Sequence, residues 1–243
     1  MEHKVTYKPF GDAAILMAWQ SEISVSIADD ILEFEQKIKA LKQANIAAVI
    51  IGYSSLTIVF ENRSINYLNE VKNLKEIYKS KYTGQKKSAF IWEIPVCYDL
   101  EFGIDLQEMS KTANLEVSEI TKLHAQKLYR VYFIGFLPGF LYLGGLHELL
   151  FFERKSNPRV QVAKGSVAIG GKQTGVYPSE SAGGWSIIGK TPIDFFNINL
   201  EDPCFAKAGD FIKFIAVDKD AFLQIEKEVK DTSYKISKTR YHA

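Results

Sequence analysis

Cysteine is scarce in this sequence, and its two cysteines stand alone. Cys97 and Cys204 are the only ones in a chain of 243 residues, and neither belongs to a CxxC pair. Two isolated cysteines do not provide the disulfide framework of a small secreted domain or the ligands of a structural zinc site. The pattern is typical of a protein in a reducing compartment, and we expect a cytoplasmic protein with no bound metal of its own.

An excess of charge of one sign is also lacking. Thirty basic residues face 29 acidic ones, so the formal net charge is +1, and we expect no nucleic-acid or membrane partner. The longest uncharged apolar run, residues 131–146, is too short and too rich in glycine to span a bilayer. The first residues lack a basic region followed by an apolar core, so no secretion signal is predicted, and the glycosylation pattern at Asn62 is interpreted as accidental.

The first third of the chain alternates short apolar runs with amphipathic segments. Residues 13–19, 47–51 and 56–60 have the composition of strands. A helix with Ser26 as its N-cap, and a second one from Ser64, are expected around them. Their predicted buried faces are Ile27, Ile31, Phe34, Ile38 and Leu41 in the first, and Ile65, Leu68, Val71, Leu74 and Tyr78 in the second. The order strand–strand–helix–strand–strand–helix predicts a small two-layer α+β domain over residues 1–82.

The rest of the chain is dominated by short strands. A basic, polar linker is expected at residues 79–88, followed by a strand at 90–98 whose Pro95 suggests an edge or a bulge. Glycine-rich turns between short strands over residues 129–217 predict a β-barrel or sandwich in a second domain, residues 89–243. Helices are expected at 105–109, where D-L-Q-E forms a capping box, at 118–127 with Ile120, Leu123 and His124 inward, and at 218–229.

Two glycine-rich segments carry most of the functional signal. Residues 129–146, YRVYFIGFLPGFLYLGGL, interleave aromatic residues with glycines and one proline, and residues 165–191 form a second loop of the same character. A buried strand does not need so many glycines. We expect these segments to let the backbone approach either another chain or a ligand.

Residues 184–191, GWSIIGKT, match the P-loop pattern GxxxxGK[ST]. In a true P-loop, backbone N–H groups would cradle phosphates, Lys190 would neutralise them and Thr191 would hold magnesium. The context argues against it, because Ile187 and Ile188 have the composition of a strand inside the pattern, and no helical sequence follows. A weaker role remains open, in which Lys190 contacts an anion outside any P-loop fold.

Other polar candidates near these loops have two interpretations each. Arg159 offers a fork for a carboxylate or phosphate, whereas Lys164 is interpreted as a solvated surface charge. His124 lies on an apolar helix face, where a core histidine is favoured over a catalytic one. Gln173 and Thr174 could orient a polar substrate or simply stabilise a turn.

Several phrases occur together in an order that resembles one family. They are VYFIGFLPGFLYL from Val131, Pro158-Arg159, Gly165-Ser166-Val167, QTGVYP from Gln173, Gly183-Gly184-Trp185 and IGKTP from Ile188. This set is similar to the 5-oxoprolinase (pyroglutamase) B-subunit family, which includes KipI-type histidine-kinase inhibitors and resembles allophanate hydrolase subunit 1. The resemblance implies an α+β protein with a small N-terminal α/β-sandwich domain followed by a C-terminal cyclophilin-like β-barrel.

The resemblance also implies partners and chemistry. Family members act with a homologous C subunit, together with an A subunit, to open 5-oxo-L-proline to L-glutamate at the expense of ATP. We therefore expect a chain that is inactive alone, with ATP and Mg²⁺ bound only in the complex. The alternative is a KipI-like inhibitor that binds a sensor histidine kinase without turnover.

Site residues follow from the same motifs. The implied catalytic residues are His124, Arg159, Gln173 and Lys190. The implied substrate- or nucleotide-binding residues, expected to line a groove at the partner interface, are Gly135, Phe136, Pro138, Gly139, Phe140, Gly165, Ser166, Thr174, Tyr177, Gly184, Trp185 and Thr191. Three departures stand out: Lys190 replaces the family's usual arginine, and the family's prolines before Gly165 and Gly183 are Ala163 and Ala182.

Overall fold

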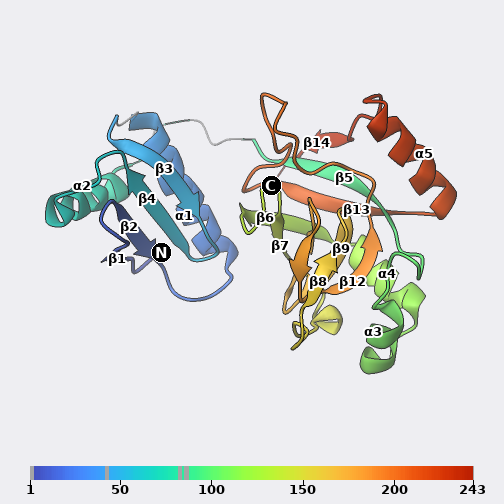
Figure 1. Cartoon of the computed structure of the whole chain (residues 1–243). Coiled ribbons are helices and arrows are strands. Elements are labelled where there is room, and N and C mark those ends of the chain that lie inside the picture. The colour runs from blue at the N-terminus through green and yellow to red at the C-terminus, as the bar shows by residue number, and fades with distance from the viewer. Residues whose placement is uncertain (1–2, 42–43, 82–83, 85–87, 243) are drawn as a thin grey trace. The chain divides into compact units, whose positions relative to one another are not determined.

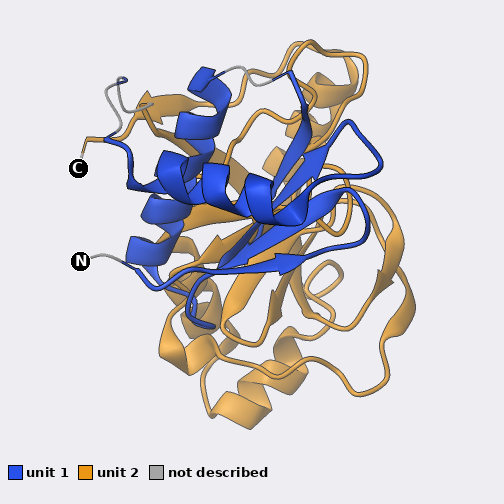
Figure 2. Cartoon of the chain, turned by 90° about the vertical axis from the view of Figure 1, so that its left-hand side faces the viewer, with its two compact units in different colours: residues 1–87 blue, residues 88–243 orange. Residues whose placement is uncertain are grey.

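The computed structural model describes residues 3–41, 44–81, 84 and 88–242. The chain divides into two compact units, residues 1–87 and 88–243, which Figure 2 colours separately. The linker expected at residues 79–88 falls largely outside the described residues.

Unit 1 is a four-stranded antiparallel sheet packed against two helices (Figure 1). Its sheet order is β1-β2-β4-β3, and alternate residues of β2 and β4, such as Ile15 and Ile58, face the helices and are fully buried. The order of elements is the predicted one: β1 (Thr6–Pro9), β2 (Ala14–Ala18), α1 (Val25–Leu41), β3 (Ile46–Ile51), β4 (Ser55–Phe60) and α2 (Tyr67–Lys79).

Helix ends are where the expectations for unit 1 were wrong. Ser26 lies inside α1 rather than capping it, and α2 is capped by Asn66, whose side chain accepts a hydrogen bond from the Asn69 N–H. Leu41 and Leu68 are exposed although both were expected on buried faces. Leu41 is the last residue of α1 and Leu68 the second residue of α2, so both lie in terminal turns, where helical periodicity no longer dictates contact with the sheet.

Unit 2 is a closed barrel with three α-helices in its described residues (Figure 1), which confirms the β-barrel and the α+β class. The sheet runs β12-β9-β10-β7-β6-β13-β5, and β12 then pairs with β5 at Lys190 and Cys97 to close the barrel. The barrel strands are β5 (Phe90–Cys97), β6 (Leu128–Ile134), β7 (Leu141–Gly144), β9 (Ser166–Gly170), β10 (Gln173–Val176), β12 (Ser186–Lys190) and β13 (Phe211–Val217).

The remaining elements of unit 2 decorate this barrel. Strand β14 pairs with the first residues of β5, and β8 with β11 forms a separate two-stranded ribbon. Their bounds, with those of the helices, are α3 (Leu106–Ala113), α4 (Val117–Ala125), η1 (Glu148–Leu150), β8 (Arg159–Val162), β11 (Ser181–Gly183), α5 (Lys219–Lys230) and β14 (Lys238–Arg240).

Among the described strands, Pro95 lies at a local edge of β5, which has a neighbour on one side only at this position. Strand β5 pairs along most of its length with β13, while β14 pairs with it only up to Trp92 and β12 only at Cys97. Pro95 therefore sits in the interval between these two neighbours, where its missing N–H leaves no ladder bond unmade.

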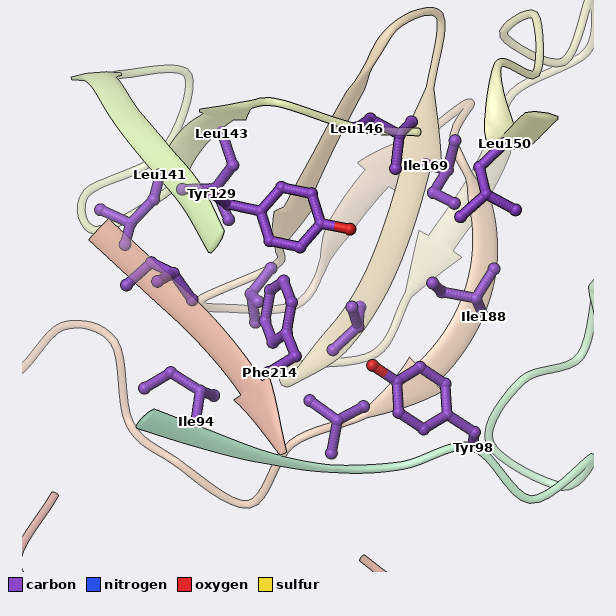
Figure 3. Close-up of a cluster of buried hydrophobic side chains, with 14 of the residues drawn as sticks. Ile94, Tyr98, Tyr129, Leu141, Leu143, Leu146, Leu150, Ile169, Ile188 and Phe214 are labelled. Carbon is purple, nitrogen blue, oxygen red and sulfur yellow. The ribbon is translucent and has the colours of Figure 1, made fainter. Parts of the chain in front are cut away.

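The barrel interior is apolar and closely packed, and Figure 3 shows Tyr98, Tyr129 and Phe214 among its aliphatic side chains. Successive residues alternate between this interior and the outer face. Val167 and Ile169 of β9 belong to the interior cluster, whereas Ala168 between them belongs to a second cluster outside. Among the described helices, none has the length and apolar character needed to cross a bilayer.

Candidate functional site

His124 lies in the barrel interior with every polar atom of its ring in a hydrogen bond. Its Nδ1 is 2.7 Å from the Tyr98 hydroxyl, and its Nε2 is 2.8 Å from Thr174 Oγ1. Helix α4 places it there, because its apolar face packs on β13, and the imidazole stacks on Phe214 with ring centroids 4.7 Å apart. The Tyr129 hydroxyl donates to the His124 carbonyl at 2.9 Å.

The hydrogen bonds define the state of this imidazole. Thr174 donates its hydroxyl proton to the Ala168 carbonyl at 3.0 Å, so it accepts from His124 Nε2–H. Nδ1 then carries no proton and accepts from Tyr98. Burial lowers the pKa of His124 to about 3, which keeps the ring neutral at physiological pH. Such a closed chain of partners holds helix α4 on the barrel, and it leaves neither nitrogen free to move a proton to or from a ligand.

An aromatic cluster lies on the outer face of the barrel, against residues of strands β9 and β12. Phe140 is its centre, with ring centroids 5.4 Å from Tyr177, 5.5 Å from Trp185 and 4.9 Å from Tyr142. Trp185 is only 6% exposed, so its ring is already largely covered by its own chain. We call Phe140, Tyr142, Tyr177 and Trp185 the outer aromatic cluster.

The glycines beneath this cluster make room for its rings. A Cβ at Gly170 would lie 2.5 Å from Trp185 Cδ1, and one at Gly175 would lie 3.2 Å from the Phe140 ring. A Cβ at Gly183 would collide with the Tyr177 hydroxyl. The close approach expected from the glycine-rich segments therefore involves, at these positions, the aromatic side chains of the chain itself.

The loop from Gly135 to Phe140 carries one exposed ring. Phe136 has φ of +64° and is 62% exposed, yet its ring meets Phe140 at 5.6 Å. A positive φ is unfavourable for a residue with a bulky side chain. Gly139 is buried with φ of +83°, and a Cβ there would meet the Phe195 carbonyl at 2.8 Å, which fixes the loop against the barrel; Pro138 is exposed.

The P-loop letters do not form a P-loop. Residues Ser186–Lys190 are strand β12, and no helix follows Thr191. The Lys190 ammonium lies over the rings of Phe102 and Phe222, 5.7 and 6.0 Å from their centroids. The Thr191 hydroxyl accepts from the Ile193 N–H, while Gly165 and Ser166 pair with this strand through their backbones. This segment closes the barrel and does not offer its N–H groups to a phosphate.

Asp105 is a buried carboxylate that the sequence presented only as a helix cap. Its side chain makes no capping bond to α3. Instead Oδ2 accepts from the Ile187 N–H at 2.6 Å, and Oδ1 accepts from Arg159 Nη2, also at 2.6 Å. The Asp105 N–H in turn donates to the Ile187 carbonyl at 3.0 Å. The capping box was thus a wrong prediction, because the carboxylate connects α3, β12 and β8.

Sequence reasoning missed Asp105 and Tyr98 for the same reason. Their partners lie 54 and 82 residues away in one case and 26 in the other, so no local spacing announces them. Buried polar groups of this kind are found from tertiary contacts. The sequence offered one weak signal: an acidic residue before a short amphipathic helix can bond either to the helix or to another segment.

The predicted site residues thus lie in several different parts of unit 2. His124 and Thr174 face the barrel interior, whereas Phe140, Tyr177, Trp185 and Gly184 lie on the outer side with Arg159. Gly165 and Ser166 lie where β9 pairs with Lys190 and Thr191 at the end of β12. Gln173 is a half-buried residue at the start of β10. Among the described residues, no group of three histidine, cysteine, aspartate or glutamate side chains is arranged to hold a metal ion.

A barrel of this topology with a small α+β unit before it matches one family model. Residues 5–206 match the family described as "Carboxyltransferase domain, subdomain C and D". A crystal structure of Kluyveromyces lactis urea carboxylase has the same fold, with a TM-score of 0.81 over 98% of this chain and 24% of that one, at 18% identity.

Relatives with higher sequence identity than the urea carboxylase define the family more closely. The B subunit of 5-oxoprolinase from Bacillus subtilis is 32% identical over 90% of this chain and 95% of its own. The protein of the same name from Haemophilus influenzae is 35% identical over 85% of this chain and 95% of its own. This chain therefore belongs to the carboxyltransferase subdomain C and D family, among the 5-oxoprolinase B subunits. It also aligns with the crystal structure of TTHA0988 at 27% identity and a TM-score of 0.74, spanning 84% of this chain but only 40% of that one.

Proposed function

We propose that this chain is the B subunit of an ATP-dependent 5-oxoprolinase that opens 5-oxo-L-proline to L-glutamate, working with a homologous C subunit plus an A subunit. The observation that carries the proposal is the near full-length similarity to proteins of that name, at 32–35% identity. The word subunit in those names is consistent with a site that needs more than one chain.

The relation to longer proteins supports a shared site. This chain spans 40% of TTHA0988 and 24% of the urea carboxylase, so the same fold occurs there next to further sequence. In this chain, two of the candidate polar residues already interact with other parts of the chain. His124 is buried and neutral, and Lys190 lies over two rings. A lactam is stable, and its opening needs a positioned activating group and a base or water.

ATP and Mg²⁺ are therefore assigned to the assembled complex and not to the strand at residues 184–191. When bound, ATP would supply the phosphoryl group that activates the lactam oxygen, with ADP as the leaving group. The contribution that fits this chain is a rigid, largely apolar wall with Arg159 beside it, which would orient the substrate and limit access of water.

Reconstitution tests the proposal. This chain and its two proposed partners, the C and A subunits, would be purified and assayed singly, in pairs and together for glutamate formed from 5-oxo-L-proline, with and without ATP. We expect glutamate only from the complete, ATP-containing mixture. Omitting this chain is the matched control and should abolish the activity.

Two other outcomes of this assay would contradict the proposal. Turnover by this chain alone would contradict the shared site. No turnover with all three chains, together with inhibition of autophosphorylation of a sensor histidine kinase, would support the KipI-like alternative.

A further inference from the structure

One nitrogen of Arg159 is buried without a partner. Nη2 donates to Asp105, but Nη1 is inaccessible to solvent and makes no hydrogen bond with any described residue. A buried N–H that lacks an acceptor carries the full cost of its desolvation. An acceptor that reaches this nitrogen regains that free energy, so the position favours an oxygen-bearing ligand.

The guanidinium is held in place by its other side. Asp105 is almost completely buried, and its Oδ1 contacts both Arg159 at 2.6 Å and Lys155 Nζ at 3.2 Å. Lys155 also pairs with Glu108 at 2.9 Å, so the two carboxylates balance the two cations of this cluster. An acceptor is therefore favoured by the unpaired Nη1 of Arg159 and not by an excess of positive charge.

Tyr177 lies close to Arg159 in the folded chain. Arg159 pairs across the β8–β11 ribbon with Gly183, and the Tyr177 hydroxyl lies against that glycine. Burial raises the pKa of Tyr177, while the Trp185 backbone N–H, Arg154 and Arg159 oppose this shift. The Tyr177 hydroxyl therefore stays protonated, and two arginines lie close enough to influence it. Phe140 packs edge-to-face against Tyr177 and Trp185, and all three rings are almost fully buried.

We propose that Asp105 is a positioning residue that orients Arg159 so that Nη1 binds the carboxylate of a small organic acid beside Tyr177. The identity of that acid as 5-oxo-L-proline rests on the proposed function, since this substrate is a five-membered ring with one carboxylate. The chemistry of recognition, a charge-assisted hydrogen bond from a fixed guanidinium, does not depend on it.

The test compares the acid with its uncharged analogue. Binding of 5-oxo-L-proline and of 5-oxo-L-prolinamide, which keeps the ring but replaces the carboxylate by an amide, would be measured on the reconstituted complex. KM would be used for the acid and the inhibition constant for the amide. We expect the wild type to prefer the acid, and Arg159→Met to reduce that preference by about tenfold or more.

Three further variants separate positioning from folding. Arg159→Lys keeps a charge for Asp105 but removes the second amino group, and should lose the same preference. Asp105→Asn keeps an acceptor for the Ile187 N–H but frees Arg159, and should also lose it, with a larger effect on KM than on kcat. Lys164→Met is the matched control, because it removes a cation from a surface pair with Asp194 and should change nothing.

Each result decides the inference. A folded Arg159→Lys or Arg159→Met variant with unchanged preference would overturn it and leave water only at Nη1. If the wild-type complex forms no glutamate, the proposed function fails, and calorimetric titration of the full chain with the acid and the amide then decides. An acid preference that Arg159→Met removes supports the site, whereas equal or absent binding of both compounds overturns it.

Discussion

The two faces of strands β9 and β10 treat their polar neighbours in opposite ways. On the inner face, His124 has a partner for each nitrogen, and Thr174 donates its own hydroxyl proton to the Ala168 carbonyl. On the outer face, Arg159 is fixed by Asp105, but its buried Nη1 has no acceptor among the residues that the structure describes. Both sites contain buried polar atoms, so burial alone does not distinguish them.

The difference lies in completeness of hydrogen bonding. A polar network that is closed within the chain stabilises a fold, because no member gains by meeting a ligand. A network with one open donor is less stable than it could be, and it gains when an acceptor arrives. Under the proposed binding role of Arg159, the inner face serves stability and the outer face serves recognition.

The largest effect is expected from His124→Ala. The change removes a buried ring and leaves Tyr98 and Thr174 short of a partner, so the free energy of unfolding should fall by about 3 kcal/mol or more. Urea denaturation of the isolated chain measures it. His147→Ala is the matched control, since that half-buried histidine only accepts from the Leu149 N–H, and it should cost about 1 kcal/mol or less. A stable but inactive His124→Ala complex would contradict a purely structural role for His124.

Acid should weaken the inner face specifically. The pKa of His124 is about 3 when folded against an ordinary 6.5 when unfolded, so the unfolded chain takes up a proton first as the pH falls. The stability linked to this group is full above pH 6.5 and is lost progressively between pH 6.5 and 3. From pH 7 to 5 the loss should be about 2 kcal/mol, measured by denaturation, and it should be absent in His124→Gln. An identical pH dependence of the two proteins would exclude His124 as the source.

Phe136 tests whether the outer face of unit 2 contacts a partner. Its ring is exposed, so Phe136→Ala should alter the stability of the isolated chain by less than about 1 kcal/mol. If the ring contacts a partner in the proposed complex, association should weaken by about 2 kcal/mol, measured by titration calorimetry with the C subunit. Leu68→Ala, at an even more exposed apolar residue of unit 1, is the control. Unchanged association would remove Phe136 from the interface.

The smallest effect is expected from Lys190→Arg, at the end of strand β12. Lys190→Arg keeps a cation over Phe102 and Phe222, so stability should change by about 0.5 kcal/mol or less and complex activity should persist. Thermal unfolding and the glutamate assay measure both quantities. Complete loss of turnover in a normally folded variant would point back to a phosphate-binding lysine, because a guanidinium does not replace a compact ammonium in a P-loop.

Local patterns predicted most of the fold. The element order of unit 1 followed from hydrophobic periodicity, and glycine-rich strands indicated a barrel or sandwich. Periodicity could not choose between those two, because closure depends on β12 meeting β5 at Lys190 and Cys97, which no local pattern encodes. It also misplaced Leu41 and Leu68, where helices end.

The candidate site was less accessible from sequence. Motifs singled out Tyr177, Trp185 and Arg159, but they did not reveal that the first two pack mainly against their own chain. Asp105 was hidden by its resemblance to a helix cap, and His124 was correctly favoured as a core residue without its partners being foreseen. The unpaired Nη1 of Arg159 could be found only from tertiary contacts.

Barrel closure also has a consequence for synthesis. Strand β13 runs parallel to β5 and pairs with residues about 120 positions earlier in the chain, so the barrel cannot be completed until its last strand leaves the ribosome. At about 5–20 residues per second, β5 waits roughly ten seconds with an unpaired apolar edge. Unit 1, whose pairings are all short-range by comparison, can form during that time. Chaperones that protect nascent strands should therefore matter more for unit 2 than for unit 1.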